Sequence, residues 1–86
     1  MQIDAALVKE QGVTFAVVVV KKYVVDNPME AQQAIRSYSG VFPGVPIVLM
    51  GQDPGGRATY YGRKDIVRFL TSVPFRSLPW KRWTLS

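Results

Sequence analysis

Residues 13–20 read Val-Thr-Phe-Ala-Val-Val-Val-Val and form the most apolar run of the chain. β-Branched residues favour extended structure, and no polar residue alternates with the apolar ones after Thr14. Both faces of this strand are therefore expected to be buried, which is typical of a central strand in a covered, largely parallel sheet. Residues 46–50 form a second continuously apolar run, and a helical segment separates the two, so we expect a parallel pair.

On the N-terminal side of this strand, residues 3–11 are predicted to form a short helix. Asp4 is a suitable N-cap, the following alanines and leucine favour helix, and Gly12 stands where a helix often ends. The alternative is a strand that pairs with residues 13–20 through a turn at Gly12.

The clearest helix start lies on the C-terminal side of the strand. Asn27 is the expected N-cap and Pro28 takes the first helical position. Apolar residues then recur at helical spacing up to Gly40, which ends the helix and gives it one buried stripe.

Pro54 and the two glycines after it have the composition of a turn. Residues 58–62 are therefore expected to return antiparallel to residues 46–50 as a hairpin. Residues 63–73 show apolar positions at helical spacing and are predicted to form the last helix, which Pro74 ends.

The resulting order is α-β-α-β-β-α with a three-stranded mixed sheet, an α/β arrangement that resembles the thioredoxin fold from its first helix onward. The marks of the resemblance are the helix start at Asn27, the proline that enters the next strand, the hairpin and the closing helix. The resemblance implies a cis peptide bond before Pro46. The family's first strand and its Cys-x-x-C segment have no counterpart here, so its redox chemistry is not implied.

The alternative is a ferredoxin-like β-α-β-β-α-β fold, in which residues 80–85 would form a fourth strand. In that fold the second strand lies at a sheet edge and the third in the centre. Residues 46–50 are wholly apolar and residues 58–62 are half polar, which favours the thioredoxin-like order. Residues 11–15 and 60–63 also resemble segments of small uncharacterised bacterial proteins, a resemblance that implies no function.

The composition excludes several classes of chemistry. A chain of 86 residues is expected to form one domain, and it contains neither cysteine nor histidine. Disulfides, thiolate metal sites and thiol catalysis are excluded, and the commonest general base is missing. A turn, a cap or a helix start explains each of Asp26, Glu30, Asp53 and Asp65, and the serines have no base beside them. We therefore expect no enzyme activity, no cofactor and no metal.

The location of the protein is expected to be cytoplasmic, because a small domain that starts at Met1 without cysteines is most simply intracellular. Residues 13–20 are far shorter than the ~20 residues that cross a bilayer. They are preceded by Asp4, Lys9 and Glu10 and not by the basic segment of a leader, and no cleavage site of small residues follows. No association with a membrane is expected.

The positive charge is concentrated in the second half of the chain. Residues 1–43 hold as many acidic as basic residues, so the whole net charge of +5 lies in residues 44–86. A one-sided basic surface indicates an anionic partner, although basic residues also serve simply to keep a small domain in solution.

Residues 1–73 are expected to form the domain, and residues 74–86 a tail that interleaves basic and aromatic residues. That pattern suits single-stranded nucleic acid, where bases stack on rings and phosphates meet cations. The alternative is that the two tryptophans fold back over the core, or over a second copy. The predicted anion-binding or nucleic-acid-binding residues are Arg57, Arg63, Lys64, Arg76, Trp80, Lys81, Arg82 and Trp83.

The glycine-rich segment 51–57 leads into a strand and not into a helix, so it is interpreted as a hairpin turn and not as a phosphate-binding loop. Arg63 and Lys64 stand at a helix start, where the dipole disfavours cations, so either Asp65 or a bound anion should offset them. The favoured function is a non-catalytic module that binds a protein partner, including a second copy as a homodimer. Binding of nucleic acid is the alternative.

Overall fold

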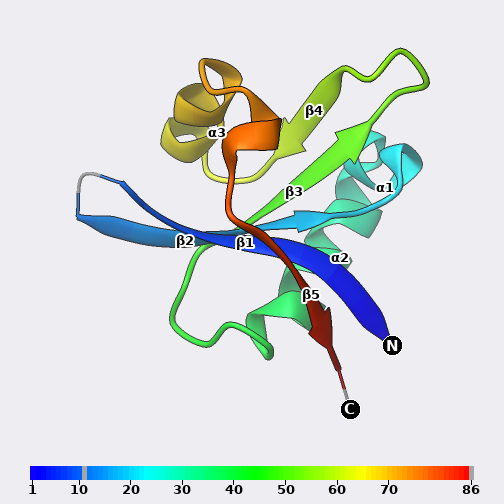
Figure 1. Cartoon of the computed structure of the whole chain (residues 1–86). Coiled ribbons are helices and arrows are strands. Elements are labelled where there is room, and N and C mark those ends of the chain that lie inside the picture. The colour runs from blue at the N-terminus through cyan, green and yellow to red at the C-terminus, as the bar shows by residue number, and fades with distance from the viewer. Residues whose placement is uncertain (11, 86) are drawn as a thin grey trace.

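A computed structural model describes residues 1–10 and 12–85 and places their strands in one five-stranded mixed sheet in the order β4-β3-β2-β1-β5 (Figure 1). The strands are β1 Gln2–Glu10, β2 Val13–Val19, β3 Ile47–Gln52, β4 Ala58–Tyr61 and β5 Trp80–Thr84. The helices are α1 Lys22–Asp26, α2 Pro28–Ser39 and α3 Lys64–Thr71, followed by the short 3-10 helix η1 Phe75–Ser77. None of these helices combines the length and hydrophobicity that crossing a membrane requires, within the residues described.

The predicted central strand is confirmed. β2 lies in the middle of the sheet, and its residues from Phe15 to Val18 are buried. It runs parallel to β3 with Ala16 opposite Ile47, and β3 pairs antiparallel with β4. The interior position of β3 and the edge position of β4 are those predicted from their apolar and half-polar sequences.

The helix predicted over residues 3–11 is wrong, because this segment is strand β1 and pairs antiparallel with β2. Ala5 and Ala6 are both fully buried on opposite faces of the sheet. Burial on two faces and the ladder to β2 outweigh a weak helix propensity. Gly12 turns the chain with φ of 80°, as the hairpin alternative required. Gln11, the end of the predicted helix, lies outside the described residues.

The three-stranded sheet and the order α-β-α-β-β-α are also wrong. The chain order is β-β-α-α-β-β-α-β, because β1 replaces the first predicted helix and residues 80–84 add β5. β5 pairs antiparallel with β1, with Ile3 opposite Trp83. The ferredoxin-like alternative fails as well, since β2 has β1 and β3 as neighbours and β5 lies beyond β1. Ser86, the last residue of the predicted tail, lies outside the described residues.

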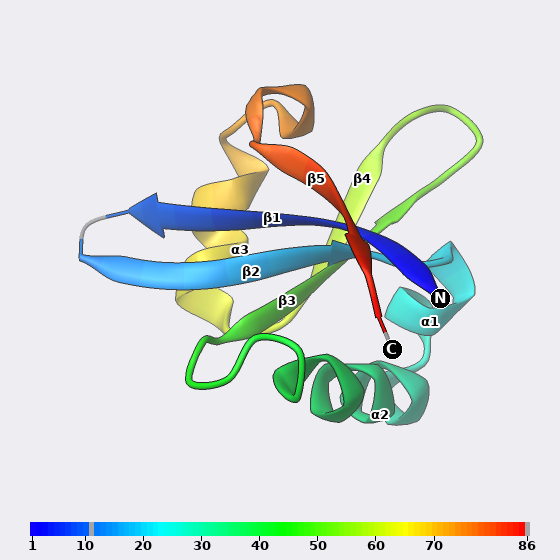
Figure 2. The same ribbon diagram turned by 60° about the horizontal axis from the view of Figure 1, so that its bottom comes forward.

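The helices divide between the two faces of the sheet. α1 and α2 pack on one face over a core that includes Ala16, Val18 and Leu49, and α3 covers the other over Phe15 and Val17. Figure 2 shows α2 and α3 on opposite sides of the strands. Both faces of the sheet are therefore covered, and segments other than helices form part of this cover.

Neighbouring residues in the sequence correctly predict the start of α2, but not the structure of the segments before and after it. The side chain of Asn27 accepts hydrogen bonds from the backbone of Met29 and Glu30 at 3.1 and 3.3 Å, which confirms the predicted cap. The preceding short helix, α1, was not predicted. The peptide bond before Pro46 is trans, so the expected cis bond is also wrong.

Candidate functional site

The predicted site residues divide between the two edges of the sheet. At one edge, Arg57 precedes β4, and Arg63 and Lys64 follow it. At the other edge, Lys81 and Arg82 lie on β5. Three strands separate β4 from β5. The structure does not bring the predicted residues into one continuous basic surface.

Two of the predicted cations are held by carboxylates. Arg63 donates from Nε and Nη2 to the two carboxylate oxygens of Asp65, at 2.8 and 2.7 Å. Arg82 donates from Nε to Asp4 at 3.2 Å, across the pair of strands β1 and β5. Asp65 is thus the internal group that offsets a cation at the start of α3, as one of the two sequence interpretations required.

The two tryptophans of β5 are half-buried and bonded within the chain. The indole of Trp80 donates to the carbonyl of Phe75 at 2.7 Å, and that of Trp83 donates to the carbonyl of Ala5 at 3.2 Å. Trp83 also packs edge-on against Phe42, with ring centroids 5.0 Å apart. These rings belong to the two core layers on opposite faces, so they do not form a common platform on which bases could stack.

The outer edge of β4 is the uncharged edge of the sheet. Asp53 donates its backbone N–H to the carbonyl of Arg57, which makes this a hydrogen-bonded pair of the β3–β4 ladder. Alternation along an antiparallel ladder then points the backbone groups of Thr59 and Tyr61 toward β3. The N–H and C=O groups of Ala58 and Tyr60 consequently point away from the sheet.

A pocket of about 270 Å³ lies beside this edge, on the face that α3 covers. Its walls come from β4, the end of α3 and the segment that follows it. The lining residues are Arg57, Ala58, Tyr60, Leu70, Thr71, Val73, Pro74 and Phe75. We call this the β4 pocket.

The β4 pocket joins an apolar wall to a polar rim. Arg57 lines it directly, and the guanidinium of Arg76 lies 5.7 Å from the ring centroid of Phe75, another lining residue. Burial raises the pKa of Tyr60, so its hydroxyl stays protonated and can donate a hydrogen bond at neutral pH. A raised pKa makes the phenol a weaker acid, which is the opposite of what acid catalysis needs.

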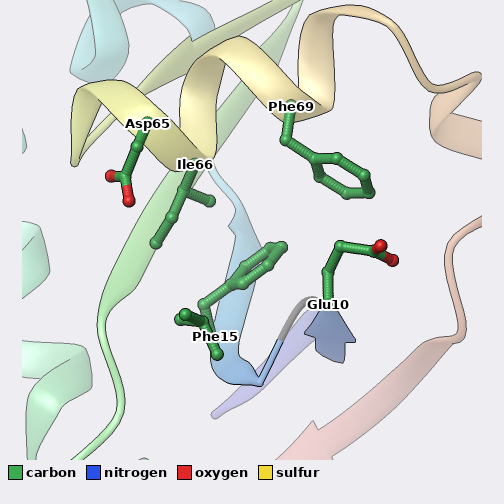
Figure 3. A pocket seen from close by; sticks show the side chains of 6 residues that line it. Glu10, Phe15, Asp65, Ile66 and Phe69 are labelled. Carbon is green, nitrogen blue, oxygen red and sulfur yellow. The ribbon is translucent and has the colours of Figure 1, made fainter.

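A second pocket, of about 130 Å³, lies between the β1–β2 hairpin and α3 (Figure 3). Phe15, Ile66 and Phe69 form its apolar part, with Glu10 beside Phe69 and Asp65 at the other side. The carboxylate of Asp65 is already held by Arg63, and Glu10 is exposed. This pocket therefore offers less binding chemistry than the β4 pocket.

The residues that complete the β4 pocket were missed from the sequence. Tyr60, Thr71 and Phe75 stand on three different elements, and only the packing of α3 against β4 brings them together. One signal was present, because alternation in residues 58–61 puts Ala58 and Tyr60 on one face. Placing that face against the last helix would have located the pocket.

The protein was compared with family models, with characterised proteins and with solved structures, and none of the three comparisons gave a match. Within residues 1–10 and 12–85, no group of three or more acidic side chains is placed to hold a metal ion.

The pairing of Arg63 with Asp65 makes a prediction about pH. Hydrogen bonds from Arg63 lower the pKa of Asp65 to about 2, below its ordinary value of about 3.9. The pair therefore stabilises the fold above about pH 4, and this contribution is lost as the pH falls toward 2. The effect on stability is small because both side chains are exposed.

An NMR titration of the Asp65 carboxyl carbon measures this pKa directly. Arg63→Gln is expected to return the pKa to near its ordinary value, while Arg68→Gln should leave it unchanged. A native Asp65 that titrates like a free carboxylate would show that the ion pair does not persist in solution.

Proposed function

We propose that this protein is a non-catalytic binding module that takes up an extended segment of a partner protein along β4. Strand addition of this kind uses the backbone groups of an open sheet edge for affinity and neighbouring pockets for specificity. The single observation that carries the proposal is the uncharged outer edge of β4, with the backbone of Ala58 and Tyr60 pointing outward beside a pocket.

The other edge of the sheet is less suited to strand addition. Lys81 and Arg82 stand next to each other on β5, and charged residues on an edge strand discourage pairing with further strands. β4 has no charged residue between Ala58 and Tyr61. The favoured edge is therefore β4.

A partner of opposite charge is favoured over a second copy. Two copies would each carry a net charge of +5, and like charges disfavour association. A second copy also has no place to pair beside β2, because β1 occupies that side of the strand. We therefore propose a heterologous, acidic partner segment.

The test is selection of short random peptides displayed on phage, followed by binding of one synthetic selected peptide. We expect the bound peptide to protect the amides of Ala58 and Tyr60 from hydrogen exchange. Ala58→Pro is expected to weaken binding about tenfold or more, since it removes an outward N–H. Proline is tolerated at an edge position whose N–H faces solvent, so the variant should remain folded.

Ala58→Ser keeps the backbone N–H and is the matched control, with near-native affinity expected. Failure to select any peptide would contradict the proposal. So would a bound peptide that protects β5 in place of β4, or unchanged affinity in a folded Ala58→Pro variant.

A further inference from the structure

We propose that the β4 pocket recognises an apolar side chain of the partner segment that lies next to a carboxylate. This inference rests on the proposed function and names the chemistry of the partner.

An added strand would place its side chains alternately on the two faces of the sheet. Half of these side chains would lie on the face of the sheet that α3 covers. Ala58 and Tyr60 line the β4 pocket on that same face. Pockets that hold drug-sized ligands have volumes of about 300–1,000 Å³. At about 270 Å³, the β4 pocket lies just below this range, a size that suits one side chain of the partner.

The apolar wall sets the first requirement for that side chain. Leu70, Val73, Pro74 and Phe75 line the pocket, and Leu70 is fully buried beneath it. An aliphatic or aromatic group placed here would remove apolar surface from water, which favours binding. A polar group in the same place would lose hydration without matching partners along this wall.

The rim sets the second requirement. Arg57 lines the pocket, and Arg76 lies over the ring of Phe75. Within residues 1–10 and 12–85, neither guanidinium forms an ion pair with a carboxylate. The carboxylate of Asp53 accepts a hydrogen bond from the backbone N–H of Arg57, and not from the guanidinium of Arg57.

The hydroxyl groups of the pocket agree with an anion. Tyr60 and Thr71 each bring a hydroxyl that can donate a hydrogen bond, and no carboxylate from residues 1–10 and 12–85 lines the pocket. The hydroxyl of Thr71 is bonded to the carbonyl of Arg68 at 2.7 Å, which leaves Tyr60 as the better placed donor. The cation of Arg57 and the neutral phenol of Tyr60, beside an apolar wall, match a carboxylate attached to an apolar group.

Two small probes test this chemistry without any contribution from strand addition. Phenylpropionate carries an aromatic ring and a carboxylate, and phenylpropanamide has the same shape without the charge. Binding is followed by the NMR shifts of the Thr71 and Phe75 amides. We expect phenylpropionate to bind in the millimolar range and about tenfold more tightly than the amide.

Variants of two arginines assign the preference to the pocket. Arg57→Gln keeps the backbone N–H that bonds Asp53 and should remove most of the preference for the carboxylate. Arg68→Gln, on α3 but outside the pocket lining, is the matched control and should retain the preference.

Equal affinities for the two probes, the absence of shifts at the pocket, or a preference that survives in a folded Arg57→Gln variant would each overturn the inference. These outcomes are separate from failure of the proposed function. The probes have no peptide backbone to add to β4, whereas the selected peptide tests strand addition whatever its side chains are.

Discussion

Replacing Phe15 with alanine is expected to lower the free energy of unfolding by about 3–5 kcal/mol. Phe15 is 2% exposed and belongs to the core layer between β2 and α3. Its ring lies edge-on to that of Phe69, with centroids 6.4 Å apart. Truncation removes this contact and leaves a cavity that the surrounding strands can only partly close.

The loss is a large part of the total stability, since a chain of this length has roughly 4–13 kcal/mol in all. Urea unfolding followed by circular dichroism measures the difference. Tyr23→Ala is the control, because Tyr23 is 61% exposed and its truncation should change stability by no more than about 0.5 kcal/mol. Similar losses of unfolding free energy in the two variants would contradict the placement of Phe15 in the core.

Replacing Trp83 with alanine is expected to cost about 2–4 kcal/mol and to release β5 from β1. The indole packs against Phe42 and bonds the carbonyl of Ala5, so truncation removes an apolar contact and a hydrogen bond together. If the residues of β5 served only to bind a ligand, the same change would leave the stability nearly unaffected.

Hydrogen exchange distinguishes these two outcomes. Met1 and Leu85 exchange backbone hydrogen bonds, so alternation points the amides of Ile3 and Ala5 toward β5. Both amides should lose protection in Trp83→Ala and retain it in Lys81→Ala, a change on the same strand at an exposed position. Unchanged protection in the folded Trp83→Ala variant would contradict a structural role for the tail.

Much of the sheet could be predicted from the sequence because its signals are local and strong. The two apolar runs in β2 and β3 are short and rich in branched residues, which favours strands over buried helices, and the helix between them favours a parallel pair. Asn27 and Pro28 fix the start of α2 through a cap that depends on a few consecutive residues. The hairpin of β3 and β4 followed from turn composition in the same way.

The parts of the fold and site that were not predicted depend on contacts between distant parts of the chain. Residues 3–10 have alanines and a leucine that suit either a helix or a strand, and only pairing with β2 on one side and β5 on the other decides between them. The aromatic and basic residues of the tail looked like a nucleic-acid surface because the sequence does not show that both indoles are bonded internally. The β4 pocket needs the packed position of α3.

Residues 80–84 occupy one edge of the sheet although they come almost eighty positions after their partner strand. Strand β1 pairs with β5 near both termini, and the N-terminal amino group of Met1 bonds the carbonyl of Leu85. During synthesis, the hairpin of β1 and β2 can form early, but the outer edge of β1 stays open until the last strand has left the ribosome. Pairing across so long a separation closes a far larger loop than the β1–β2 hairpin does, so β5 joins the sheet at a higher cost in chain entropy.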